Sequence, residues 1–393
     1  MVSGRARAPT AGPTGRSPAL DVDLSTVAWR GLCVFVFSIP FSIFIAQLLL
    51  ILTTVAAVAD WRAHGRPRLK TPLDLPIACF LATALLASLL GLYPSESLYG
   101  LRTYLQVVIV YLVYAYARDL ERSLALVHAF LAGSAITAAY ALLGAALPSL
   151  FPRLFLGQMT QSGQLLFALS FALPLLLRGV FSARWLRPGL ALFVAALVVN
   201  LKRGVWLGVI ASVMTVGLLA SRRLLLAAGL VVVLTATVVP PVRTRITNSA
   251  RDLSLPGNRF DIWLAAIDVV ERFPMGVGRK NGEILRDYPN IPQHHKHAHN
   301  NPLQITLESG FLGLAAFLWW MGRFAWLSWR AMQRISPSEG RLQALAVGVF
   351  ASFVGFHVAG LVEYNFGDSE VLEIFFVTMG LGLVVDEIAR RDG

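Results

Sequence analysis

The stretch LSTVAWRGLCVFVFSIPFSIFIAQLLLILTTVAAVAD, Leu24 to Asp60, decides the fold class of this chain. It is apolar almost throughout, but it is too long for a single membrane crossing, because about 20 helical residues span the hydrocarbon core. Pro40 interrupts it near the middle, and proline breaks the interior of an α-helix. We therefore expect two membrane-spanning helices joined by a tight turn.

The same apolar character extends along the whole chain. Of its 393 residues, 56% are hydrophobic and 14% are charged, and the mean hydropathy is +0.64. These values lie outside the usual range of soluble globular proteins. The net charge of +12 does not indicate a nucleic-acid partner, because much of the Lys and Arg lies in short breaks between apolar runs. The sequence predicts an all-α polytopic membrane protein that contacts membrane lipids.

Basic segments indicate which ends of the helices face the cytoplasm. Residues 1–23 are rich in Pro, Gly, Ala and Arg, which predicts a disordered cytoplasmic tail. The segment WRAHGRPRLK after Asp60 is also basic, and placing both segments inside requires an even number of crossings. We predict about 12 transmembrane helices with both termini cytoplasmic. The first two lie in 24–60, and the others are 73–91, 103–117, 124–146, 163–178, 188–201, 206–221, 224–241, 303–322, 342–360 and 370–385.

One polar segment, 242–302, is long enough to hold structure outside the membrane. The alternation of spans places it on the outer surface, as part of a single transmembrane domain that covers 24–393. Its positive charge does not contradict this placement, because long loops are largely exempt from the charge rule. Its stretch NRFDIWLAAIDVVERFP has apolar residues at helical spacing and ends at a proline. This pattern predicts an amphipathic helix at the outer surface.

Two basic residues lie in a very short outer turn. LKRGVW places Lys202 and Arg203 on the same side of the membrane as the long loop, against the positive-inside bias. A guanidinium matches the oxygens of a phosphate, so Arg203 is either part of an anion site or a contact to lipid headgroups. Arg259, in the loop, would complete a two-pronged site for a diphosphate.

Four histidines precede the span at 303–322. HHKHAH has a lysine in its middle and lacks the convergent ligands of a metal site, so we predict no metal and no cofactor. His294, His295 and His297 are interpreted as surface or headgroup contacts. His299 differs because it lies at the interface, where a neutral imidazole can accept a proton.

The span that follows His299 carries an unusual carboxylate. Glu308 lies in its first turns, where an ionised group is costly and usually has a partner. It is too far along the helix from His299 for direct pairing, so any link between them must run through the fold. Gly310 and Gly313 are three residues apart, which lets another helix approach closely.

Several stretches together resemble the O-antigen ligase and polymerase superfamily. HNNPLQITLESGFLG resembles its signature of a histidine, a small polar residue, nine further residues and two glycines three apart, at His299, Asn300, Gly310 and Gly313. KRGVWLG resembles its Arg-Gly turn, although Lys202 stands where we expect a small polar residue. GNRFDIWLAAIDVVERFPMGVG resembles its loop segment with Arg259, and GLVEYNFGDSEV resembles the end of many family members.

The resemblance implies a metal-independent glycosyltransferase of the GT-C kind in the bacterial inner membrane. Such an enzyme moves a glycan from undecaprenyl diphosphate to an acceptor hydroxyl on the periplasmic side. For an O-antigen ligase the acceptor is the lipid A-core oligosaccharide. By the same resemblance His299 would be the general base, and Arg203 and Arg259 would bind the diphosphate. Direct attack by the acceptor would invert the anomeric centre.

Further residues are candidates for supporting roles. Arg102 lies at an outer break and would assist with phosphate or acceptor binding. Glu363 lies in the last outer turn and would shape the acceptor site or brace the loop. Lys202, Asn300 and Glu308 are further candidates.

Other functions remain open at this stage. An O-antigen polymerase would use a second lipid-linked repeat as acceptor, and a protein O-glycosyltransferase of the same superfamily would use a serine or tyrosine. A transporter would instead place substrate-binding charges near the middle of the membrane and often has repeated halves. The charges here gather at one face, which favours an enzyme over a transporter, and the histidine-glycine motif favours the ligase over the polymerase.

Overall fold

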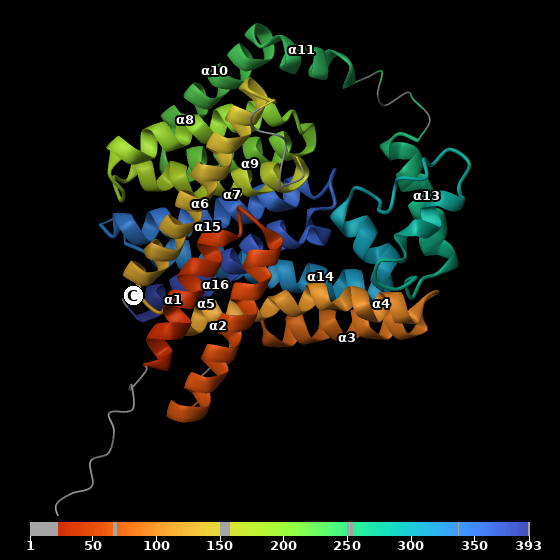
Figure 1. Ribbon diagram of the computed structural model, residues 1–393, viewed down its shortest axis with the longest axis horizontal. Coiled ribbons are helices and arrows are strands. Elements are labelled where there is room, and N and C mark those ends of the chain that lie inside the picture. Colours follow the sequence, from red (N-terminus) through yellow and green to blue (C-terminus); the bar gives the residue numbers. More distant parts are fainter. Residues whose placement is uncertain are drawn as a thin grey trace, which may run out of the picture.

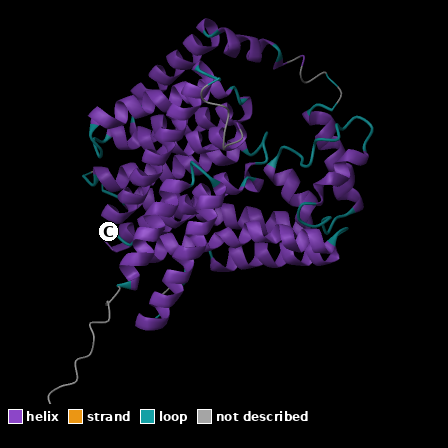
Figure 2. Ribbon diagram, viewed as in Figure 1, coloured by secondary structure: helices purple, strands orange, loops and turns teal. Residues whose placement is uncertain are grey.

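The computed structural model describes residues 23–65, 69–149, 158–249, 251, 255, 257–336 and 338–391. Within these ranges every regular element is a helix (Figure 2). The all-α fold predicted from the sequence is therefore confirmed. The tail predicted for residues 1–23 lies outside the described residues, except for Asp23.

Most of the helices pack side by side in one bundle, with α13 at one end of it and α10 and α11 along its edge (Figure 1). In chain order they are α1 (Leu24–Ser38), α2 (Ile43–His64), α3 (Asp74–Leu90), α4 (Pro94–Gly100), η1 (Leu101–Val107), α5 (Val108–Tyr116), α6 (Leu120–Ala146), α7 (Gln158–Leu177), α8 (Ala183–Asn200), α9 (Arg203–Ala220), α10 (Arg222–Val238), α11 (Pro240–Thr247), α13 (Arg259–Arg272), η2 (Asn281–Asp287), α14 (Asn301–Arg334), α15 (Gly340–Ala359), η3 (Asn365–Gly367) and α16 (Ser369–Arg391).

Residues 24–60 fold into two packed helices, as the sequence predicted. Asp23 caps the first of them, because its carboxylate accepts hydrogen bonds from the backbone N–H groups of Ser25 and Thr26 at 3.0 and 3.3 Å. α1 ends just before Pro40, and α2 begins just after it. The interruption predicted at Pro40 is confirmed.

Six helical segments in the described part of the chain are long and apolar enough to cross a membrane. α10 and α11 form a seventh candidate if they are counted as one span, although they meet at a bend of 88°. Large apolar side chains are exposed along α2 and α10, as expected for helices that face lipid. The protein is therefore a multi-pass α-helical membrane protein. The six segments are Ile43–His64, Pro94–Tyr116, Leu120–Ala146, Met159–Leu177, Asn301–Arg334 and Gly340–Ala359.

α14 extends well beyond the span predicted at 303–322. The basic stretch RFAWLSWRAMQR, which lies between the spans predicted at 303–322 and 342–360, is helical throughout. It contains neither glycine nor proline, and Arg323 and Arg330 lie 4.6 and 5.1 Å from the ring centroid of Trp326. Stacking on the tryptophan lets the two arginines remain on the helix surface. The helix α14 thus continues through the basic stretch that follows the predicted span.

A break inside α14 admits the loop segment 274–278. Gly310 has φ 68° and ψ −173°, which no helix contains. The N–H groups of Val277 and Gly278 donate to the two carbonyls just before Ser309, at 2.9 and 3.1 Å. The first N–H after the break donates to the carbonyl of Pro274 at 3.2 Å. The inserted segment therefore satisfies backbone groups that the broken helix leaves unpaired.

The chain that approaches Gly310 is this loop segment and not the helix that we expected. A Cβ atom built on Gly310 would lie 2.5 Å from the carbonyl carbon of Met275. At Gly313 a neighbouring helix, α3, is present, with Thr83 Oγ1 3.8 Å from the position of a Cβ. The two glycines of the motif therefore have different neighbours: Gly310 lies against the loop segment, and Gly313 lies near α3.

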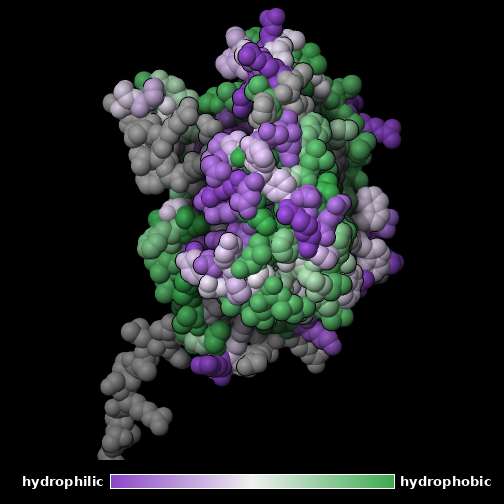
Figure 3. All heavy atoms as spheres, turned by 90° about the vertical axis from the view of Figure 1, so that its right-hand side faces the viewer, coloured by the Kyte–Doolittle hydropathy of each residue, from purple (hydrophilic) through white to green (hydrophobic). Residues whose placement is uncertain are grey.

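The segment between α10 and α14 forms a small helical unit at the end of the bundle. Its amphipathic helix, predicted in 258–274, is confirmed as α13, which begins at the N-cap Asn258. Figure 3 looks onto this end of the molecule, where hydrophilic side chains gather between apolar ones. The unit has its own apolar core, which consists of Ile262, Ala265, Ala266, Val269, Val270, Val277, Leu285, Ile291, Ala298 and Leu307.

We predict that Gly310→Ala lowers the free energy of unfolding by more than about 1 kcal/mol, because a side chain there needs a positive φ and meets the inserted segment. Thermal unfolding of the detergent-purified protein measures this. Gly322→Ala on the same helix is the matched control, because nothing lies within 4 Å of its Cβ position. Equal midpoints for the two variants would contradict the role of the break.

Candidate functional site

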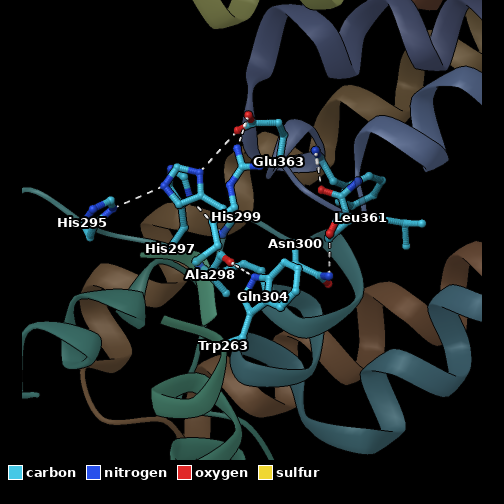
Figure 4. A network of polar contacts seen from close by, with 12 residues as sticks. Trp263, His295, His297, Ala298, His299, Asn300, Gln304, Leu361 and Glu363 are labelled. Atoms are coloured by element: carbon cyan, nitrogen blue, oxygen red, sulfur yellow. Dashed lines mark hydrogen bonds and ion pairs between the residues drawn. The ribbon is translucent and has the colours of Figure 1, made fainter. Parts of the chain in front are cut away.

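Glu363 lies where three separate parts of the chain meet. Glu363 is buried, with 7% of its surface exposed. Its Oε1 accepts a hydrogen bond from Arg259 Nη2 at 2.6 Å, and its Oε2 lies 3.4 Å from His299 Nδ1 (Figure 4). Burial alone raises the pKa of this carboxyl, but His299, Arg259 and the charge of Lys202 outweigh it and hold the pKa below the usual range. Glu363 is therefore ionised at neutral pH.

The start of α9 brings the third part of the chain to Glu363. Gly204 packs against this carboxylate so closely that a Cβ atom on it would lie 2.5 Å from Oε1. Lys202 is the N-cap of α9 and makes no side-chain cap hydrogen bond. The first N–H groups of a helix attract anions. The helix start therefore adds a partial positive charge to the site.

Arg203, the first residue of α9, turns its side chain toward α11. Its Nη1 donates to the carbonyl of Arg245 at 3.1 Å and to Ser249 Oγ at 2.7 Å. The backbone of Arg203 thus adjoins Glu363 through Gly204, while its guanidinium connects the site to the long loop. Both arginines that the sequence indicated lie at the same end of the bundle as His299.

Asn300 holds His299 in place and does not face the carboxylate. Its Oδ1 accepts from the N–H of Leu303 at 2.8 Å, which caps α14, and its Nδ2 donates to the carbonyl of Leu361 at 2.8 Å. His299 just before it has φ 50°. These contacts connect the start of α14 to the turn that carries Glu363, so Asn300 has a positioning role.

The other histidines surround His299. Nδ1 of His295 lies 3.3 Å from Nε2 of His299. The His297 ring lies between the rings of His299 and Tyr364, with centroid distances of 4.1 and 5.5 Å. Burial and the neighbouring His299 lower the pKa of His297 to about 4. His295 and His297 are partly buried, whereas His294 is exposed.

Glu308 has a buried partner that the sequence analysis missed. Arg279 follows the inserted segment, and its guanidinium forms an ion pair with Glu308 and a hydrogen bond with Tyr364. The two charged side chains are 3% and 1% exposed. Burial lowers the pKa of Arg279, but Glu308 and the nearby tyrosines outweigh this effect and raise it. The sequence signal for such a partner was Glu308 itself, because a carboxylate in an apolar helix needs a nearby cation.

The link between Glu308 and His299 runs through Gln304. Gln304 Nε2 donates to Glu308 Oε1 at 2.9 Å, and its Oε1 accepts from the backbone N–H of Ala298 at 2.7 Å. The carbonyl of Ala298 accepts from Trp263 Nε1 at 2.9 Å. Ala298, the residue before His299, is thus held by hydrogen bonds to Gln304 and Trp263. Glu308 is therefore linked to His299 indirectly, through Gln304 and Ala298.

Arg102 is placed apart from Glu363. It lies on η1, is exposed, and stacks on the ring of Tyr99, with 3.8 Å between its guanidinium carbon and the ring centroid. Its charge contributes to lowering the pKa of Lys280, after burial. Among the described residues, no group of three or more His, Cys, Asp or Glu side chains is arranged to hold a metal ion.

Part of the chain is similar to a known protein family. Residues 188–318 match the family described as O-Antigen ligase, and this match covers about a third of the chain. The matched region contains Lys202, Arg203, Arg259, His299 and Glu308, and the resemblance recognised in the sequence is confirmed.

Similar curated proteins come from Rickettsia. A Rickettsia conorii protein named "Putative polysaccharide ligase" is 27% identical over 139 residues, which is 33% of this chain and 30% of that protein. Proteins of the same name from Rickettsia prowazekii and Rickettsia felis are 29% and 28% identical over 89 residues, 23% of this chain and 18% of each of them. The chain therefore matches less than a third of the length of each relative.

We predict that Glu308→Ala destabilises the protein by about 3–5 kcal/mol, because it leaves Arg279 buried without a counter-ion. Glu121→Ala is the control, because Glu121 also pairs with an arginine, Arg341, but on the exposed surface, where solvent screens such a pair and it contributes little to stability. Thermal unfolding compares the two variants. A similar small loss in both would contradict the structural importance of the buried pair.

The pKa of His297 predicts a pH dependence of stability. The unfolded chain protonates this imidazole near 6.5, but the folded protein does so only near 4, so stability is full above pH 6.5 and decreases as the pH falls toward 4. His297→Gln should reduce that loss by roughly 2 kcal/mol. Unfolding curves at several pH values test this, with His294→Gln as the exposed control. An unchanged pH dependence in His297→Gln would contradict the prediction.

Proposed function

We propose that this protein is an O-antigen ligase of the bacterial inner membrane. It transfers a glycan from undecaprenyl diphosphate to a hydroxyl of the lipid A-core oligosaccharide on the periplasmic side. The observation that supports this proposal most is the meeting of His299, Arg259 and the start of α9 around Glu363, at one end of the helix bundle. A base and an anion site that adjoin each other are what transfer from a diphosphate requires.

We infer about 12 crossings, with both termini in the cytoplasm and the loop 242–302 in the periplasm. Each predicted span coincides with a helix or a continuous helical run, which supports this topology. The same topology places His299, Glu363 and the start of α9 on one side of the membrane. The helices and runs concerned are α1, α2, α3, α4 with η1 and α5, α6, α7, α8, α9, α10, α14, α15 and α16.

In this mechanism His299 is the general base. Glu363 holds Nδ1 of the imidazole, which leaves Nε2 as the nitrogen that takes the proton of the acceptor hydroxyl. The hydroxyl oxygen forms a bond with the anomeric carbon as the bond from that carbon to the diphosphate oxygen breaks. The diphosphate leaves with the electron pair, and a single displacement inverts the anomeric centre.

The leaving diphosphate needs positive charge that is already in place. Arg259 and Arg203 are assigned to it, and the N-terminus of α9 adds the partial positive charge of a helix start. A guanidinium carries several N–H donors, so Arg259 can contact Glu363 and a phosphate oxygen together. Glu363 then aligns the base and the diphosphate-binding arginine with each other. The two guanidiniums take the role that a divalent ion has in other transferases.

We predict that His299→Ala lowers the rate of transfer by about 10²–10⁴-fold, and that Arg203→Ala and Arg259→Ala abolish it, while all three remain folded. The assay supplies the purified protein with a lipid-diphosphate-linked glycan in the presence of a chelator. Arg272→Ala is the matched control, because Arg272 lies on α13 with Arg259 but is exposed and pairs with Asp268. Full activity in one of the first three variants would remove that residue from the site.

The choice of acceptor separates the related functions. Product on lipid A-core that disappears in His299→Ala supports the ligase. Lengthening of the lipid-linked glycan would identify a polymerase, and transfer to a serine or tyrosine peptide would identify a protein glycosyltransferase. Transport of the glycan without transfer to any acceptor would contradict the enzyme.

A further inference from the structure

Each transfer leaves one proton on the base, and this inference rests on the function proposed above. The hydroxyl proton ends on Nε2 of His299, while the glycan is joined to the acceptor oxygen and the diphosphate leaves as an anion. His299 must lose that proton before it can act again. The second ring nitrogen, Nδ1, faces the carboxylate of Glu363, so the proton has to leave from Nε2.

The polar group beside Nε2 is the imidazole of His295. Nδ1 of His295 lies 3.3 Å from Nε2 of His299, and the two rings meet edge to face with 5.4 Å between centroids. Figure 4 shows that His295 approaches His299 from the side opposite Glu363. The ring of His295 in turn lies 4.4 Å from that of the exposed His294. The imidazole of His295 thus lies between the base and the surface.

We propose that His295 is the proton relay that resets His299 after each transfer. Its Nδ1 accepts the proton from Nε2 of His299, and its own Nε2 releases a proton to solvent. The exchange balances, because His299 loses one N–H, His295 gains one at Nδ1 and loses one at Nε2, and the solvent receives one proton. His295 then returns to its starting tautomer by exchanging its Nδ1 proton for one on Nε2 through solvent water. His295 acts through His299 and does not contact the reacting sugar, so it is a positioning and relay residue.

The ring of His295 is uncharged before the exchange, so its Nδ1 can face Nε2 of His299 without charge repulsion. Burial and the neighbouring His299 and His294 lower the pKa of His295, so the ring is neutral at neutral pH. Arg286 holds the backbone carbonyl of His295 through Nε at 3.1 Å. Beyond these groups, the nearby charges belong to the surface ion pair between Lys296 and Glu283 and to Glu363 on the far side of His299.

His297 also contacts His299 but is not suited to the relay. Its Nδ1 faces the backbone N–H of His299 at 3.4 Å and does not reach the nitrogen that carries the proton. Its ring is packed against Tyr364, and a pKa of about 4 makes it a poor acceptor at neutral pH. The neighbouring histidines therefore differ in chemistry because they differ in burial and in the atom that they face.

The acceptor hydroxyl and His295 contact the same nitrogen, so they do so in turn. The hydroxyl occupies Nε2 during the attack, and His295 takes this place when the product leaves. Removal of His295 should therefore slow turnover without weakening the binding of the acceptor. A lower kcat with an unchanged KM therefore distinguishes a relay from a merely structural role.

The test compares His295→Ala with the wild-type protein at low buffer concentration, with saturating lipid-linked glycan and lipid A-core. We expect kcat to fall about tenfold, with an unchanged KM for the acceptor. Added imidazole should restore kcat, because a small base replaces the missing side chain. The kcat of the variant should also rise with pH where that of the wild type is flat. His294→Gln, the exposed neighbour, is the control and should keep the wild-type kcat and pH profile.

Two results would overturn the relay. One is a wild-type kcat for His295→Ala at low buffer concentration. The other is a lower kcat that neither imidazole nor higher pH restores, which would assign His295 a structural role. Absence of transfer by the wild-type protein would instead contradict the proposed function itself, so the two failures can be told apart.

Discussion

The insertion of residues 274–278 into the break of α14 is the contact on which the rest of the site depends. Three backbone hydrogen bonds join the loop segment to the helix on both sides of Gly310. They fix Arg279 beside Glu308 in a region where neither charge has access to solvent. A long loop would otherwise be free to move relative to the membrane helices. These hydrogen bonds join the loop that carries α13 and the histidine segment directly to α14.

Glu363 connects this loop to the residues of the proposed chemistry. One carboxylate contacts Arg259 from the loop and His299 from the start of α14, and it lies against the first turn of α9. Its charge is stabilised by the same groups that it orients, which is why its pKa is lowered in spite of burial. The buried ion pair is also connected to this carboxylate. Tyr364 donates a hydrogen bond to Glu308 and packs against the ring of His297, which contacts His299. Base and arginine are therefore positioned as one unit.

The sequence was sufficient for features that depend on residues close together in the chain. Apolar runs, the interruption at Pro40 and the amphipathic pattern of α13 each express a local preference, so the helices that they predict are present. The family resemblance has the same basis, because it rests on residues at fixed short spacing around His299 and Arg203. The pattern did not predict how far α14 extends, because its basic stretch after the predicted span is also helical, with arginines stacked on Trp326.

By itself, then, the sequence determined that this is a multi-pass helical membrane protein, and it indicated His299, Arg203 and Arg259 as the residues to examine. Only the tertiary structure decided which groups contact them. Arg259 and Glu363 are 104 positions apart, and Arg279 and Tyr364 are 85 apart, so no local pattern could pair them. The same holds for the ring nitrogen of His299 that each neighbour faces, because the direction of a side chain depends on how the loop packs. Residue types follow from the sequence, whereas their contacts depend on the folded chain.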